Sequence, residues 1–177
     1  YAADNGARVL NNSWGGLGIS QTLIDAFHYA YYKGSVAIAI AGNDNRDMSS
    51  YFPAAIDTVI AVAASTQRDE KASFSNYGAK ISVAAPGGGY ENELGTGVFD
   101  QYNILSAIPD EAYPTLTIAE GYGRLAGTSM AAPHVSGVAA LIISKNLGIT
   151  NDEVRQIIEN TADDIGQPGK DIYFGYG

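Results

Sequence analysis

The runs VAIAIA at residues 36–41 and VIAVA at residues 59–63 decide the fold class of this 177-residue chain. In both runs apolar side chains occupy successive positions, whereas a strand with one face in water would alternate apolar and polar residues. Strands that are apolar on both faces are typical of parallel sheets covered by helices on each side. The two runs therefore predict an α/β fold of three layers, with a mostly parallel sheet between helices.

Strand-like and helical segments alternate around these runs, as a parallel sheet requires. Strands are expected at residues 8–13, 35–41, 58–63 and 81–84, and a helix at residues 22–33. Ser20 is the expected N-cap of that helix and Gly34 its terminator. Its apolar face, predicted to pack on the sheet, consists of Leu23, Ile24, Phe27, Ala30 and Tyr31.

Two further helices are expected in the C-terminal half. Residues 129–147 are small or aliphatic nearly all round, which predicts a helix buried within the domain and ending at Gly148. Pro133 would clash with the carbonyl of Ser129, so a distorted first turn is expected. The sequence TNDE at residues 150–153 is a capping-box pattern and starts the last helix. Residues 86–123, rich in Gly, Pro and Tyr, are expected to form long surface loops around a functional rim.

Composition excludes several classes of partner. Ten Lys and Arg against 19 Asp and Glu give a formal net charge of -9, which would repel a phosphate backbone, so no nucleic acid is expected. The absence of Cys excludes disulfides and thiolate metal sites. No apolar run approaches the roughly 18 residues of a membrane span. The chain opens at Tyr1 without a leader, and the fold is expected to be incomplete at both ends.

The stretch GTSMAAPHV at residues 127–135 is the strongest indication of chemistry. It places Ser129 at the N-terminus of a helix, where unpaired backbone N–H groups stabilise negative charge that develops on a substrate oxygen. Helix geometry by itself leaves a second interpretation open, in which Ser129 or Thr128 only caps a buried helix.

This stretch, continued by SGVAAL at residues 136–141, resembles the serine block of the subtilisin-like serine peptidases, the subtilases. AIAGN at residues 39–43 resembles the strand end where an asparagine amide donates to the oxyanion. VLNNSWGG at residues 9–16 is similar to the strand that pairs with the substrate backbone and walls the pocket for the residue before the scissile bond. The resemblance implies Ser129 as nucleophile and Asn43 as oxyanion donor, with substrate contacts from Ser13, Trp14, Gly15, Ala41, Gly42 and Thr128.

Two of these assignments have ordinary alternatives. Asn43 could simply end a strand in a left-handed conformation, and Trp14 could be a half-buried aromatic without a substrate role. By the same resemblance, Pro53 is expected to follow a cis peptide bond.

The family's Asp and His blocks, Asp-(Ser/Thr)-Gly and His-Gly-Thr-His, precede the substrate strand and do not occur in this chain. The DNG at residues 4–6 follows no apolar strand and is interpreted as a turn. His134 lies five residues after Ser129, about 140° around the helix, and is interpreted as a packed, hydrogen-bonded residue. His28 is expected on the surface of the first helix, away from the site.

Residues 1–177 are therefore expected to be a partial subtilase catalytic domain, whose Asp and His come from the N-terminal part of the same peptidase. The implied function is a serine endopeptidase that cleaves protein or peptide substrates through an acyl-enzyme on Ser129, with this chain inactive alone. By family analogy it is secreted. The alternative function is a non-catalytic subtilase-like binding or assembly module.

No cofactor is expected, and a structural calcium ion is left open as an alternative. Residues 43–47, NDNRD, carry oxygen ligands at alternate positions, but they lack the following Gly and the distal Glu of an EF-hand calcium loop, so a polar loop is predicted. The glycines at residues 87–89 and 121–123 do not form a dinucleotide-binding motif.

Overall fold

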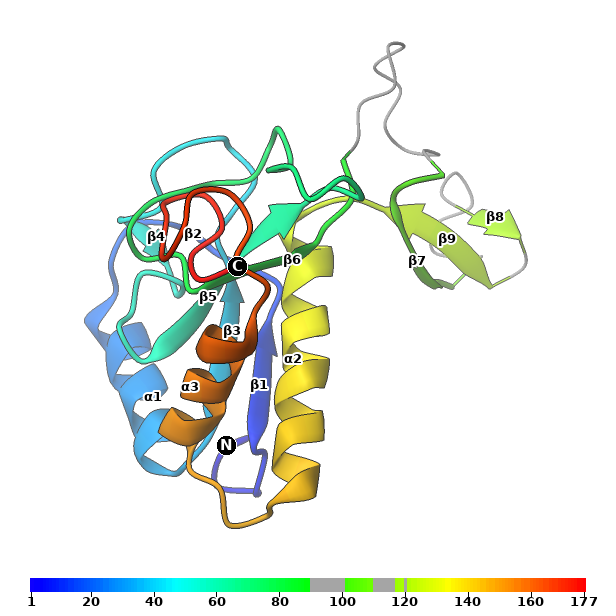
Figure 1. The fold of residues 1–177 in the computed structure, drawn as a ribbon. Helices are drawn as coiled ribbons and strands as arrows, with labels where there is room; N and C mark the ends of the chain where they lie inside the picture. The colour runs from blue at the N-terminus through cyan, green and yellow to red at the C-terminus, as the bar shows by residue number, and fades with distance from the viewer. Residues whose placement is uncertain (90–100, 110–116, 120) are drawn as a thin grey trace.

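The computed structural model describes residues 1–89, 101–109, 117–119 and 121–177. Its main sheet has the strand order β1-β3-β5-β6 and is parallel throughout (Figure 1). The strands are β1 (Val9–Asn12), β3 (Val36–Ile40), β5 (Val59–Ser65) and β6 (Val83–Pro86). The predicted parallel sheet is confirmed. Strand β6 begins two residues later than expected, and the N–H of Ile81 donates to the carbonyl of Gly78 in the preceding turn.

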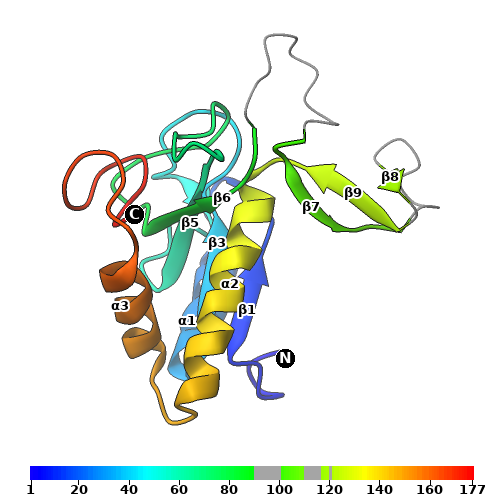
Figure 2. The same ribbon diagram turned by 45° about the vertical axis from the view of Figure 1, so that its right-hand side comes forward.

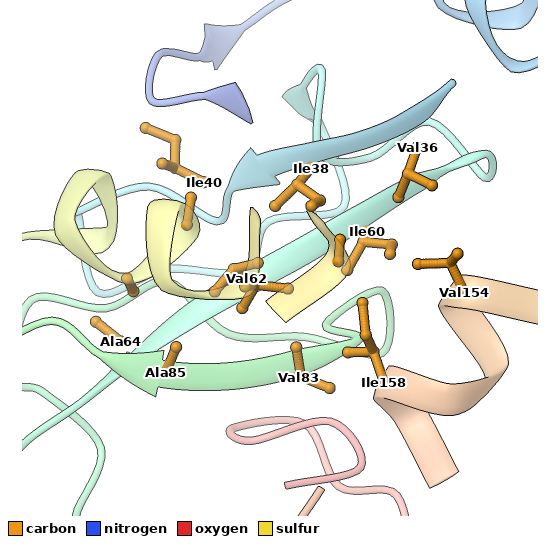
Figure 3. Close-up of a cluster of buried hydrophobic side chains, with 14 of the residues drawn as sticks. Val36, Ile38, Ile40, Ile60, Val62, Ala64, Val83, Ala85, Val154 and Ile158 are labelled. Atoms are coloured by element: carbon orange, nitrogen blue, oxygen red, sulfur yellow. The ribbon is translucent and has the colours of Figure 1, made fainter. Parts of the chain in front are cut away.

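Strands β3 and β5 are buried at every position, and their side chains alternate between two separate cores. One core receives the larger side chains of both strands, together with Val154 and Ile158 (Figure 3). The opposite core receives mostly alanines from the same strands. Because apolar residues occupy both sets of alternate positions, both faces of the sheet must be covered.

Helices cover these two faces. α1 (Gln21–Tyr32) lies on the alanine face, whereas α2 (Thr128–Lys145) and α3 (Asn151–Thr161) lie on the other (Figures 1 and 2). The three-layer architecture is thus confirmed. The predicted N-cap of α1 is confirmed, since Ser20 Oγ accepts from Leu23 N, and α3 begins with the complete capping box of Thr150 and Glu153. Among the described residues, no helix is long and apolar enough to cross a membrane.

One face of α2 contradicts the prediction of all-round burial. Val138 is 47% exposed and Leu141 is 68% exposed, and Pro133 and His134 are exposed beside them. Within the described part of the chain, the sheet and α3 cover only the opposite face. Small and aliphatic composition indicates that a helix can be buried, but it does not show which segment would bury each face.

The region predicted to be surface loops contains a second sheet. The strands β7 (Ile104–Ala107), β8 (Thr117–Ala119) and β9 (Tyr122–Leu125) are antiparallel in the order β7-β9-β8, and they project away from the helices (Figures 1 and 2). The loop prediction is wrong for these segments, because all three strands are short, and the exposed residues of β7 and β9 break the pattern of a buried strand. Residues 90–100, 110–116 and 120 lie outside the described part.

Two very short strands were also not predicted. β2 (Gly16–Leu17) and β4 (Tyr51–Phe52) pair antiparallel, with Gly16 opposite Phe52 and Leu17 opposite Tyr51. Strands of two residues are too short to show a hydrophobic period. The expected cis peptide bond is confirmed between Phe52 and Pro53.

Candidate active site

The candidate site forms where the carboxyl ends of two neighbouring strands meet the N-terminus of α2. Ser13 follows β1, and Ala41, Gly42 and Asn43 follow β3, which is the parallel neighbour of β1. The Ser13 hydroxyl donates to the Ser129 carbonyl at 3.0 Å, and the Ser129 hydroxyl donates to the Ser13 carbonyl at 3.3 Å. Ligand sites of open α/β sheets form at this edge.

Pro133 explains why the Ser129 carbonyl is available to Ser13. In an unbroken helix that carbonyl would accept from the backbone N–H four residues later, and proline has none. α2 nevertheless continues through Pro133, and the Ser13 hydroxyl is the donor to the Ser129 carbonyl. The proline therefore allows a side chain from the β1 segment to fasten the first turn of α2.

The carboxamide of Asn43 is held in one orientation by Thr128. Its Oδ1 accepts from the backbone N–H of Thr128 at 2.9 Å and from the Thr128 hydroxyl at 2.8 Å. Thr128 is fully buried, whereas Asn43 is exposed. Because both bonds go to the oxygen, the Nδ2 of Asn43 is the end left to donate. A Cβ atom placed on Gly127 would lie 3.5 Å from this Nδ2, so the amide faces the turn just before Ser129.

The first turn of α2 supplies a second donor. The backbone N–H groups of Met130 and Ala131 both donate to the Gly127 carbonyl. The backbone N–H of Ser129 has no acceptor among the residues that the structure describes, as expected for the open first turn of a helix. The site therefore presents a hydroxyl, a helix N–H and a side-chain amide on neighbouring residues, an arrangement that can bind a developing oxyanion.

Asn76 fastens the loop that carries Asn43, and sequence reasoning missed it. Its side chain is fully buried; Oδ1 accepts from Asp44 N and Arg46 N, both at 3.0 Å, and Nδ2 donates to the Ala41 carbonyl at 2.9 Å. These hydrogen bonds therefore fix the chain both before and after Asn43 in the sequence. No sequence pattern marks Asn76, since its partners lie 30 to 35 residues away.

The two histidines lie in different places. His134 borders a groove of about 290 Å³ that is also lined by Ser129, Met130 and residues of β7. Its Nδ1 lies 2.8 Å from the Met130 carbonyl and must donate to it. His134 is hydrogen-bonded as predicted, but the prediction that it is packed is wrong, because it lies on the uncovered face of α2. His28 is half-buried on α1, which lies on the other face of the sheet from α2.

Two other assigned residues also lie at this edge. Trp14 is 50% exposed, and its ring centroid is 6.3 Å from that of Phe27. Gly15 precedes β2 and lies against Tyr51 of β4. In contrast, Asp4 of the predicted turn accepts from the Tyr29 hydroxyl near the end of α1, which immediately precedes β3. Asp4 therefore lies at the amino edge of the sheet, away from Ser129.

Fold and site together define an α/β protein with a serine and an amide converging at the carboxyl edge of a parallel sheet. The chain belongs to the subtilase family, whose model matches residues 1–177. It is 44% identical over 177 residues to the thermophilic serine proteinase of Bacillus sp. (strain AK1), and 43% identical over 169 residues to thermitase of Thermoactinomyces vulgaris. The alignments cover 100% and 96% of this chain, but only 37% and 51% of these relatives.

Structural comparison agrees with this assignment. The crystal structure of a lanthipeptide protease superimposes with a TM-score of 0.84 at 28% identity, covering 99% of this chain and 60% of the other. The resemblance to the subtilases and the subtilisin-like fold are therefore both confirmed.

Proposed function

We propose that this chain is the nucleophile-bearing part of a subtilisin-like serine endopeptidase, a partial catalytic domain over residues 1–177. The observation that supports this most directly is the fixed amide of Asn43, whose Oδ1 is bound by the residue next to Ser129. An amide held in this way needs no reorganisation when charge develops on the substrate, and this is the condition for electrostatic stabilisation of a transition state.

In the proposed reaction, Ser129 Oγ attacks the carbonyl carbon of the scissile bond. Asn43 Nδ2 and the Ser129 backbone N–H donate to the resulting oxyanion. A histidine takes the serine proton and passes it to the departing amine, which leaves an acyl-enzyme that water hydrolyses. The substrate is a protein or peptide, and Ser13, Trp14 and Gly15 are proposed to contact it directly. The other three assigned residues, Ala41, Gly42 and Thr128, are buried and are proposed to shape the site from behind. The proposal invokes no cofactor.

The Asp and His of the triad are proposed to come from the N-terminal part of the same peptidase, as preceding residues or as a separate chain. The 177 residues contain two histidines, and the placement of both argues against a role as base. His28 is on the far face of the sheet, and the side chains of Ser129 and His134 diverge, because a separation of five residues places them about 140° apart around the helix. Exposed Val138 and Leu141 offer an apolar surface on which such a segment would pack.

Secretion is part of the proposal. It is supported by relatives whose names describe them as extracellular proteases.

Covalent labelling with a fluorophosphonate probe tests the proposal. The 177-residue chain should label weakly, whereas the complete polypeptide should label strongly and hydrolyse peptides. Ser129→Ala should abolish labelling. Ser136→Ala, a matched control on the same helix, should retain it.

Strong labelling of the 177-residue chain would contradict the inference that this chain lacks the general base that activates Ser129. A complete polypeptide that neither labels nor cleaves peptides would contradict catalysis and favour the non-catalytic binding module.

A further inference from the structure

The ring of Tyr51 lies between two of the glycines assigned to substrate binding. A Cβ atom placed on Gly15 would lie 2.6 Å from Tyr51 Cε1, and one placed on Gly42 would lie 2.7 Å from Cζ and 2.9 Å from Cε2. The two glycines follow neighbouring parallel strands, β1 and β3. Opposite edges of one ring therefore approach the backbones of both segments, closer than a side chain at either position would allow.

The backbone that carries this ring is fixed from several directions. Tyr51 lies opposite Leu17 in the β2–β4 pair, its N–H donates to the Met48 carbonyl at 2.8 Å, and its carbonyl accepts from Ala55 N at 2.9 Å. The half-buried ring also packs against both hydrophobic cores. Moving it outward would expose apolar surface of both cores to water.

The space between Gly15 and Gly42 matters for substrate choice. If the segment after β1 lines one side of the pocket for the residue before the scissile bond, and the segment after β3 lines the other, Gly15 and Gly42 would leave room between them for a large substrate side chain. In this chain the tyrosine ring occupies that room. We propose that Tyr51 fills this pocket and restricts the residue before the scissile bond to a small, uncharged side chain such as alanine, glycine or serine. This inference rests on the proposed function.

The surroundings of the ring are consistent with an uncharged side chain that fills the pocket. Burial, and to a smaller extent the Asp44 carboxylate, raise the pKa of Tyr51, so its hydroxyl stays protonated at neutral pH. The same carboxylate would repel an acidic substrate side chain in this position. Charge and steric exclusion therefore both select against glutamate and aspartate, whereas steric exclusion alone selects against phenylalanine.

The test is a peptide series that differs only in the residue before the scissile bond, with alanine, leucine or phenylalanine there. In the complete protease, we expect kcat/KM to be highest for the alanine peptide. Tyr51→Gly should raise the ratio of phenylalanine to alanine kcat/KM by about 10-fold or more, because the vacated ring space admits the larger side chain. Tyr51→Phe keeps the ring and should keep the native preference.

A matched control separates the pocket from general loosening of the fold. Tyr31 is another half-buried tyrosine, on α1, and its hydroxyl donates to Asp152. Tyr31→Ala should leave the phenylalanine-to-alanine ratio unchanged. Should Tyr51→Gly fail to fold, the preference of the unmodified enzyme still decides the question.

Peptide binding to the complete Ser129→Ala protein, followed by fluorescence polarisation, gives a readout that does not require hydrolysis. Preferential binding of the alanine peptide without any hydrolysis by the unmodified protein would contradict the proposed function and support the filled pocket. A preference for phenylalanine in the unmodified protein would overturn the role of Tyr51, and so would an unchanged ratio of phenylalanine to alanine kcat/KM in Tyr51→Gly. Peptide hydrolysis in either case would still support the proposed function.

Discussion

Replacing Asn76 by alanine should weaken both the fold and the proposed oxyanion donor. Three hydrogen bonds join its buried side chain to the chain around Asn43, at Ala41, Asp44 and Arg46. Each such bond contributes about 0.5–1.5 kcal/mol net, so their loss sums to about 1.5–4.5 kcal/mol. That is a large fraction of the roughly 5–15 kcal/mol by which a domain is stable.

Denaturant unfolding of the complete protein measures the first effect. Asn76→Ala should lower the free energy of unfolding by about 2–4 kcal/mol. Ser35→Ala is the matched control, because Ser35 is also buried and its hydroxyl donates a single hydrogen bond, to the Ala7 carbonyl at the amino edge of the sheet. It should cost about 1 kcal/mol and leave kcat unchanged.

A double-mutant cycle measures the second effect. Asn76→Ala should lower kcat, because Asn43 is no longer held on both sides, but it should lower kcat little further in an Asn43→Ala background. Equal kcat losses in the two backgrounds would refute the view that Asn76 acts through Asn43. A loss of stability below about 0.5 kcal/mol would refute the energetic reasoning itself.

Two further predictions follow from the geometry. Asn43→Ala should lower kcat about 10²–10³-fold in the complete enzyme, a magnitude that was itself measured on a subtilisin; an unchanged kcat would remove Asn43 from the site. Hydrogen bonds from the Thr150 backbone and hydroxyl lower the pKa of Glu153 from its ordinary value of 4.5. The Glu153 carboxylate therefore stabilises the folded state fully above pH 4.5, and this stabilisation is lost as the pH falls through the lower pKa of the folded state. Glu153→Gln should therefore make the acid-side fall of Tm, followed by circular dichroism, less steep than in the unmodified protein; parallel Tm curves would contradict the capping role.

Much of the fold could be predicted because the sequence patterns that indicate it are local. The continuous apolar runs of β3 and β5 required helices on both faces, Ser20 and Thr150 marked helix starts, and the serine block marked α2. Each signal depends on residues within one or two turns of the chain. The same locality explains the errors, since composition could not show that Val138 and Leu141 are uncovered.

The sequence by itself determined the family, the three-layer sheet and the identity of Ser129 and Asn43 as candidates. Only the tertiary structure decided that Thr128 holds the Asn43 amide across 85 residues of chain, that Asn76 fastens its loop, and that the Tyr51 ring lies between two glycines. Propensities and caps are set by neighbours along the chain, whereas these contacts arise only when packing brings distant segments together, and that packing depends on the whole chain at once.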